Sequence, residues 1–598
     1  MKAIIKSFLS WFLSTRSTII NLFLIGILFQ TYLVCHKKFF YPLIKILFVA
    51  LAAQLICGFV KTAGKQKFII VIILFVIFLR LPFYFFPDGM ITMSDNALEA
   101  LQCQEIQKNN LVPFFLLEAI RHEGTWKYLG IAYLWDFFGE NYLYYLFLQL
   151  VIFLYLMWLL YKIFKPLAEK KALLGLIFLN FVFIELLFDY SLSIRGATYL
   201  EMLMLLAFGF YVFDFEFVDK VKIFLSYYFV FFAIYIHPLA AFLAASFAFC
   251  TFIYSLKKRK FLFNFILTAA GFLAGCFHLF YYHFFFKAKP PLAELTEIVQ
   301  LGPFSSLSLR SLVELAKSFI AIFWNIFRFQ FYFPVNYYPK GNFGSVLSCL
   351  NQAVVYFSLI IFVVAIVLSF QKTLRLLLHN EDLNTQSWPF PFFLVLLFMV
   401  IIKLLLLRPF RPEPRHNFDL LLLIIFSYLF VFPLLRIKKF FSPKAVLSCL
   451  LLLAFASPHY ISFLRMAHHK QGSYRALMRA LEKNKVRYLT ADFGIAYTIH
   501  FLSGGKILVS DSLGPLTVQN FWRYSPEMIK EVDQASVSEK AYLFEAEDTP
   551  SRPWHKSATI KIKSQVLESL KKDGLGYKTI KLTDYTLIIP KKKKTSGP

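Results

Sequence analysis

Side chains that could do chemistry gather in a few short segments of an otherwise apolar chain. The densest segment, 408–416, holds three arginines and a histidine: Arg408, Arg411, Arg415 and His416. The planar donors of arginine bind two oxygens of one phosphate, so this spacing favours a phosphate-binding surface. Glu413 and anionic lipid headgroups are the alternative partners that would neutralise the same charge.

A second segment carries Asp95, which follows an apolar stretch and opens a run with apolar residues at helical spacing. A carboxylate at the start of a helix outside the membrane can accept a proton from an attacking hydroxyl, so Asp95 is a candidate general base. The simpler interpretation is a helix N-cap, a role that Ser94 or Asp95 would serve. The local sequence leaves both interpretations open.

Two further cations are candidate phosphate ligands. Arg195 lies in a predicted turn between apolar stretches, where it either binds a phosphate or pairs with Asp189 or Glu201 to hold helix ends. Lys403 lies deep in an apolar stretch, from which its side chain can extend to the membrane surface or to a lipid phosphate. His237 precedes a proline at a predicted helix break, and we expect a structural role for it.

Membrane helices must position these residues. Of the 598 residues, 59% are hydrophobic, and the mean hydropathy is +0.62. Apolar stretches of about 17–25 residues can cross a hydrocarbon core. The fold class predicted is therefore an α-helical integral membrane protein with about thirteen spans. The spans are expected at 17–35, 41–60, 68–86, 141–162, 172–188, 197–215, 222–237, 238–256, 262–284, 346–369, 389–407, 418–435 and 444–463.

Basic residues predict the orientation of these spans. Clusters such as 162–171, 257–260 and 436–444 fall on one side, which the positive-inside rule makes cytoplasmic. The net charge of +28 is then a topology and lipid-headgroup signal and does not predict nucleic-acid binding. The sequence 36–38 falls on the opposite side and disagrees with this arrangement. The seven cysteines suggest neither a disulfide framework nor a zinc site.

Three longer polar segments, two loops and the C-terminal tail, are expected on the outward side. Loop 87–140 is expected to hold surface helices at 95–108, 113–121 and 126–138, and loop 287–345 another at 309–322. The tail alternates between helical and strand patterns, which predicts a small α/β domain. The expected organisation is a membrane domain over 1–463 and an outward-facing soluble domain over 464–598.

The first outward loop also carries a family resemblance. A span ends in Leu79-Arg80-Leu81-Pro82, Asp95 opens a helix, and Arg121-His122-Glu123-Gly124 precedes a Phe138-Gly139 turn before the next span. Here the chain resembles the polyprenyl-phosphate-dependent glycosyltransferases of the GT-C superfamily, such as the protein O-mannosyltransferase and aminoarabinose transferase relatives. Two departures are Asn96 after Asp95, where a second acidic residue is frequent, and Gly124-Thr125-Trp126, where a Pro-Pro run is common.

The resemblance implies a transferase that moves a sugar from a polyprenyl-phosphate donor to an acceptor hydroxyl on the outward side of the membrane. A bacterial inner membrane, with this side periplasmic, is expected over the endoplasmic reticulum because the sequence shows no retention signal and its outward domain shows no cysteine pairs. It implies Asp95 as the catalytic carboxylate, and it implies outward arginines that contact the lipid phosphate. Glu123 lies near a position where some members hold an acidic residue that binds a divalent metal ion. The implied partners are the lipid-linked sugar, a glycan, lipid or protein acceptor, and membrane lipids.

Other functions stay open. An O-antigen ligase or polymerase would use a lipid-diphosphate donor and would centre its site on one large late loop. A transporter or lipid flippase should show charges at mid-span and broken helices, as Lys403 and the proline after His237 do. A structural scaffold would leave the arginine cluster unexplained.

Overall fold

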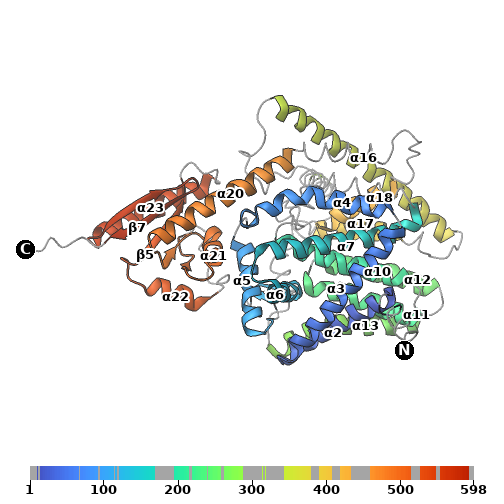
Figure 1. Ribbon diagram of the computed structural model, residues 1–598. Coiled ribbons are helices and arrows are strands. Elements are labelled where there is room, and N and C mark those ends of the chain that lie inside the picture. The colour runs from blue at the N-terminus through green and yellow to red at the C-terminus, as the bar shows by residue number, and fades with distance from the viewer. Residues whose placement is uncertain are drawn as a thin grey trace, which may run out of the picture.

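In the computed structural model, the described residues are 10, 12, 14–65, 67–91, 94–113, 115–117, 120–168, 194–214, 219–238, 240–257, 261–286, 313, 317, 342–378, 389–406, 418–431, 458–513, 525–546 and 553–591. The described helices of the N-terminal part form one bundle, and a smaller unit of helices and strands lies at its side (Figure 1). The predicted spans 172–188 and most of 444–463 lie outside the described residues, as does most of the predicted helix 309–322.

Five helices within these ranges are long and apolar enough to cross a membrane. They are α2 (Thr15–Cys35), α3 (Phe40–Lys65), α7 (Tyr142–Ala168), α13 (Phe261–Phe286) and α16 (Asn342–Leu378). The bundle also contains α4 (Lys67–Arg80), α10 (Ile194–Asp214), α11 (Asp219–Ile236), α12 (Ala240–Lys257), α17 (Pro389–Leu406) and α18 (Phe418–Val431). Each coincides with a span expected from hydropathy, and the helix break at His237 is confirmed.

Close backbone approach holds the centre of this bundle together. Gly271 and Gly275 of α13 lie against α11, where an added Cβ would come within 2.7 Å of the carbonyl oxygens of Phe224 and Tyr228. Small residues four apart allow such contact between membrane helices, where packing replaces the hydrophobic effect. Gln30 of α2 donates a hydrogen bond to the Gly275 carbonyl at 2.8 Å. The three helices therefore form one rigid group.

Between α4 and α7 the chain leaves the bundle and forms a small outer layer. This layer contains η1 (Leu81–Phe85), η2 (Asp88–Met90), α5 (Ser94–Asn109), β1 (Phe115–Leu117), β2 (Ile120–Gly124) and α6 (Trp126–Phe138). The helices predicted at 95–108 and 126–138 are confirmed.

The helix predicted at 113–121 is wrong, because this segment enters an antiparallel β1–β2 hairpin that pairs Leu117 with Ile120. Thr125 Oγ1 donates to the Pro113 carbonyl at 2.7 Å and closes the base of the hairpin. The pattern of apolar residues is local, and it does not contain this contact between the two ends of the segment 113–125.

The C-terminal part is a mixed sheet with helices, as the tail pattern predicts. Its elements are α20 (Pro458–Lys483), β3 (Tyr488–Thr490), α21 (Phe493–Leu502), β4 (Leu508–Ser510), α22 (Pro526–Gln534), β5 (Lys540–Glu545), α23 (Pro553–Lys572), β6 (Gly576–Lys581) and β7 (Tyr585–Lys591). The strand order is β4-β3-β5-β7-β6, with β3 parallel to β4 and β5, and β7 antiparallel to β5 and β6. Helix α22 was not predicted; Ser525 caps its N-terminus.

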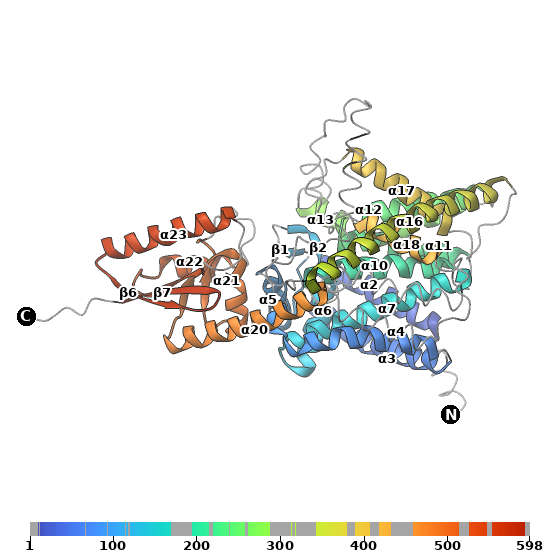
Figure 2. The ribbon, with the colours of Figure 1, turned by 90° about the horizontal axis from the view of Figure 1, so that it is seen from above.

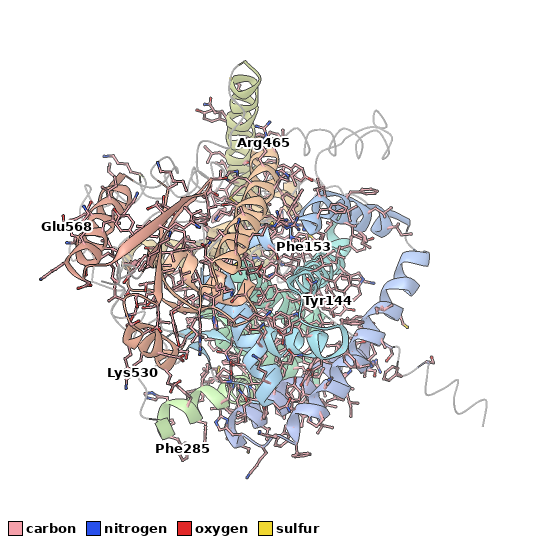
Figure 3. All side chains as sticks on the ribbon, turned by 60° about the vertical axis from the view of Figure 1, so that its left-hand side comes forward. Tyr144, Phe153, Phe285, Arg465, Lys530 and Glu568 are labelled. Carbon is pink, nitrogen blue, oxygen red and sulfur yellow. The ribbon has the colours of Figure 1, made fainter. Side chains whose placement is uncertain are left out.

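Helix α20 connects the two parts without a break and passes through residue 464, where the sequence suggests a domain boundary. Figure 2 shows this helix running from the bundle into the sheet beside α5. Figure 3 looks towards the C-terminal part, with Arg465 on α20, Lys530 on α22 and Glu568 on α23 labelled. The outer layer of the bundle is thus the surface on which the C-terminal part rests.

Candidate functional site

Helix α5 is the element that carries Asp95, and it lies at the junction of the two parts. It packs against α6 and α10 on the bundle side and against α21 on the other (Figures 1 and 2). Asp95 is the second residue of α5, so its predicted place at a helix start is confirmed. Positions 95 and 99 lie one turn apart on the same side of the helix. The side chain of Asp95 lies outside the described ones.

One turn further along α5, Glu99 forms a buried ion pair. Its Oε2 atom lies 2.9 Å from the Lys127 ammonium of α6, and each side chain is only 1% exposed. The Tyr145 hydroxyl of α7 donates to the same carboxylate at 2.9 Å. Charged groups are costly to bury unless they are paired and hydrogen-bonded, and here both conditions are met. This pair joins three helices.

A second carboxylate extends this cluster to α10. Glu201 is 1% exposed, and it lies near enough to Lys127 and Glu99 for their charges to act on its carboxyl. Its Oε2 atom has no hydrogen-bond partner among the described residues. We refer to Glu99, Lys127, Glu201 and Tyr145 as the buried charge cluster. The sequence analysis missed its pairing; the one local signal was a lysine in the otherwise apolar run 126–138.

The backbone beneath Lys127 is held firmly. The preceding Thr125 N–H donates to the Tyr235 hydroxyl of α11 at 3.1 Å. A Cβ at Gly124 would lie 2.8 Å from the Tyr235 carbonyl oxygen, so this position needs glycine for close packing on α11. Lys127 therefore projects from a helix start that is fixed to the centre of the bundle.

For three of the other predicted site residues, the structure describes the backbone and not the side chain. The backbone at Arg195 lies in the first turn of α10, so the prediction of a turn outside the helix is wrong. The backbone at Lys403 lies in α17 and that at Glu123 in β2. The side chains of these three residues are outside the described ones, and Arg408, Arg411, Arg415 and His416 lie outside the described residues altogether. Their binding of a phosphate stays a prediction.

Arg80, at the end of α4, is a buried cation with a structural role. Its guanidinium lies 4.2 Å from the centroid of the Phe153 ring, and one of its nitrogens donates to the Val76 carbonyl at 3.2 Å. Cation–π contacts of this kind stabilise a desolvated arginine.

Cys103 of α5 is fully buried. Burial raises the pKa of its thiol well above the usual value, and the charge of Glu99 raises it further. A neutral, enclosed thiol is a poor nucleophile. Cys103 therefore serves packing rather than chemistry.

The C-terminal part fixes the segment just before α5. The Tyr474 hydroxyl of α20 donates to the Ile91 carbonyl at 2.8 Å. A Cβ at Gly89 would lie 1.9 Å from the Ala467 carbonyl oxygen, so η2 and α20 touch backbone to backbone. Burial raises the pKa of the Asp88 carboxyl in η2, and Arg475 of α20 opposes this shift. Both sides of the Asp95 segment are thus held, by the bundle and by α20.

The comparisons with known proteins can be set against this geometry. No family model matches the chain, and no curated protein matches it. Among solved structures, one match is the crystal structure of ArnT from Cupriavidus metallidurans bound to undecaprenyl phosphate, with 10% identity, 88% of this chain and 99% of that chain covered, and a TM-score of 0.45. The apo form of the same protein matches with the same identity and coverage and a TM-score of 0.39.

This chain is structurally similar to ArnT. The resemblance to the aminoarabinose transferases that the sequence predicts is confirmed at this level.

Among the described side chains, no group of three or more His, Cys, Asp or Glu residues could hold a metal ion. Glu123 has its side chain outside this set, so metal binding through Glu123 stays a prediction, and no chemical step is derived from it.

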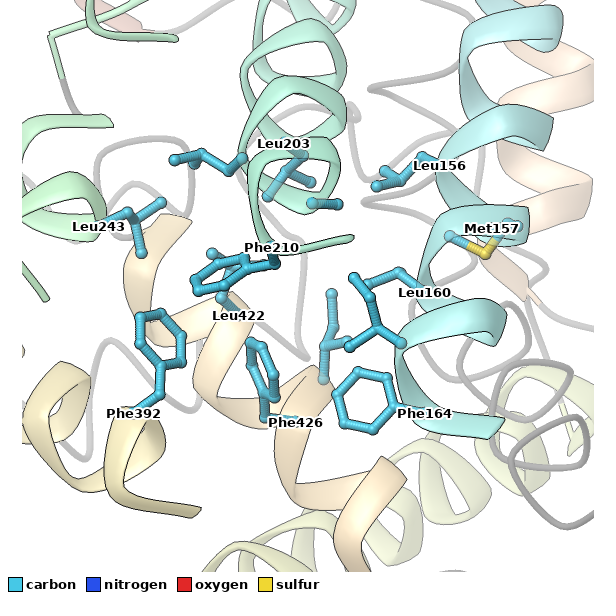
Figure 4. Close-up of a pocket in the computed structure, with 14 residues that line it drawn as sticks. Leu156, Met157, Leu160, Phe164, Leu203, Phe210, Leu243, Phe392, Leu422 and Phe426 are labelled. Atoms are coloured by element: carbon cyan, nitrogen blue, oxygen red, sulfur yellow. The ribbon is translucent and has the colours of Figure 1, made fainter. Parts of the chain in front are cut away.

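A small cavity deeper in the bundle is wholly apolar. It has a volume of about 40 Å³ and lies between α7, α10, α12, α17 and α18 (Figure 4). Leu203 and Leu206 of α10 line it, so it begins just beyond Glu201 along that helix. Its lining offers no hydrogen bond to a sugar or a phosphate. The polar side chains described above lie instead where α5, α6 and α10 meet.

Proposed function

We propose that this chain is a membrane glycosyltransferase of the GT-C type that transfers a sugar from a polyprenyl-phosphate donor to an acceptor hydroxyl. The observation that carries the proposal is the placement of Asp95 at the start of α5, one turn from the buried charge cluster, on a helix that also packs against α10. This is an outer layer built on membrane helices, where a lipid-linked donor can meet a water-soluble acceptor. We place this layer on the periplasmic side of a bacterial inner membrane.

The proposed reaction is a single displacement. The Asp95 carboxylate takes the proton of the acceptor hydroxyl, whose oxygen attacks the anomeric carbon. The bond between that carbon and the donor phosphate oxygen breaks, and the polyprenyl phosphate leaves with the electron pair. One displacement inverts the anomeric centre. The negative charge that develops on the leaving phosphate is stabilised by nearby cations, for which the candidates are Arg195, Lys403, Arg408, Arg411, Arg415 and His416.

The test is sugar transfer by the purified protein in nanodiscs, with a panel of radiolabelled polyprenyl-phosphate sugars and a membrane extract as acceptor. Asp95→Asn should lower kcat by about 10²–10⁴-fold, the usual contribution of a general base. Arg411→Ala should lower kcat and raise the donor KM, because the leaving phosphate loses a cation. Asp136→Asn is the matched control, since Asp136 is an exposed carboxylate on α6 that pairs with Lys45.

Full activity of a folded Asp95→Asn protein would show that another group is the base. Transfer from lipid-diphosphate donors alone would replace the donor class with that of the O-antigen ligases. If no donor is consumed, transport of a lipid becomes the leading function.

A further inference from the structure

The buried charge cluster has no place in the reaction as proposed, yet it contains charges that a membrane protein could replace with apolar residues. A buried ion pair contributes little net stability, because desolvation offsets the attraction. In some proteins a buried polar or charged group instead fixes one arrangement of helices among several. We therefore expect a role of the cluster in holding helices in position.

The members of the cluster come from the helices that hold candidate site residues. Glu99 lies one turn beyond Asp95 on the same side of α5. Glu201 lies on α10 six residues beyond Arg195, which is about 9 Å along the helix axis. Lys127 projects from the start of α6 and forms the ion pair with Glu99. One side chain thus ties the helix of the candidate base to α6, and both of these helices contact α10, which carries a candidate phosphate ligand.

The anchor of this link is rigid. Thr125 and Gly124, just before Lys127, are fixed to Tyr235 of α11 by a hydrogen bond and by close packing. Tyr145 of α7 holds the Glu99 carboxylate from another direction. Lys127 therefore holds α5 at a fixed position relative to the bundle.

We propose that Lys127 is a positioning residue that holds the N-terminal half of α5, with Asp95, in register with the N-terminal half of α10, with Arg195. Its ammonium binds Glu99 at 2.9 Å, and α5 and α6 both contact α10, so this ion pair fixes α5 beside the helix that carries Arg195. This inference rests on the proposed function, because Asp95 and Arg195 are the groups it aligns. Reaction rates fall steeply when reacting groups are displaced by about 1 Å.

Lys127→Met and Glu99→Gln test this role. Both should lower kcat per folded molecule by about 100-fold, while the donor KM changes far less, because the cations of segment 408–416 still bind the lipid phosphate. Lys45→Met is the matched control: it breaks a lysine–carboxylate bond to the same helix α6, at 2.8 Å, in a partly exposed place. Size-exclusion chromatography and thermal melting establish the folded fraction. A merely structural lysine would lower that fraction and leave kcat per folded molecule unchanged.

Hydrogen–deuterium exchange supplies a readout that does not depend on activity. Lys127→Met should speed amide exchange in 94–109 and in the first turns of α10, and Lys45→Met should not. Unchanged exchange in both segments, or unchanged kcat in an active protein, would overturn the inference and leave the proposed function standing. If the wild-type protein transfers no sugar while α5 still loosens in Lys127→Met, the proposed function fails and the tethering of α5 by Lys127 stands.

Discussion

At the scale of single residues, the Tyr145 hydroxyl stabilises a carboxylate that is removed from water. Glu99 is 1% exposed, and it accepts one hydrogen bond from Tyr145 besides its contact with Lys127. A hydrogen bond to a charged group contributes more than one between neutral groups, because the charge has lost its water. The Tyr145 hydroxyl therefore stabilises the cluster together with the ion pair.

Tyr145→Phe removes the hydroxyl and keeps the ring. We expect the free energy of unfolding to fall by about 1.5–3 kcal/mol, the usual contribution of a hydrogen bond to a charged group. Denaturation of the detergent-solubilised protein measures it. Tyr144→Phe on the same helix, labelled in Figure 3 and only partly buried, is the control and should change it by less than about 0.5 kcal/mol. Equal effects of the two changes would contradict this account of Tyr145.

At the scale of elements, η2 and α20 form the contact that fixes the start of α5 from the C-terminal side. Gly89 is what allows it, since its α-carbon faces the backbone of α20 at Ala467. Glycine is required at this position because a side chain would not fit, and not because of its backbone conformation. Gly472, also on α20, meets no atom within 4 Å at the position of an added Cβ.

These two glycines make a matched pair of tests. Gly89→Ala forces η2 away from α20 and should lower the free energy of unfolding by about 1–3 kcal/mol, as overpacking does. Gly472→Ala should raise it by about 0.5–1 kcal/mol, because alanine loses less conformational freedom in a helix interior. Thermal melting of both variants compares them directly. A Gly89→Ala protein as stable as the wild type would show that the two backbones do not touch.

At the scale of the whole molecule, α21 of the C-terminal part packs on α5 of the membrane part. Trp135 of α6 stacks on Phe501 of α21 with ring centroids 6.5 Å apart. His500 of α21 has its Nδ1 atom 2.8 Å from the Ile507 carbonyl oxygen, and Lys108 and Glu105 of α5 act on its charge. Burial lowers the pKa of His500 below its ordinary value, Lys108 lowers it further, and the Ile507 bond and Glu105 oppose the shift.

This shift predicts how stability depends on pH. The folded protein binds a proton at His500 less readily than the unfolded chain does, so stability is present above the ordinary pKa of 6.5 and is lost as the pH falls below it towards the folded-state value. His500→Gln should therefore weaken the loss of stability between about pH 7 and about pH 5. Melting curves across this range test the prediction. An identical pH dependence of stability in the two proteins would show that His500 does not cause the loss of stability at low pH.

The sequence by itself determined the membrane class, the helices coinciding with predicted spans, the break at His237 and the mixed character of the C-terminal part. Hydropathy and hydrophobic period are local properties, so a single sequence contains them. It also placed Asp95 at the start of a helix, because a polar residue before an apolar period marks a helix N-terminus. Its role as a base stays a prediction, as do the roles of the arginines.

Only the tertiary structure decided how these elements meet. The segment 113–121 forms part of a hairpin because Thr125 returns to Pro113, a contact that no local period reveals. Arg195 lies in the first turn of α10, a helix that packs against both α5 and α6. Tyr145 and Glu99 are 46 residues apart in sequence and share one hydrogen bond. A buried charge is stable only with its partners in place, and those partners come together only when separate helices pack.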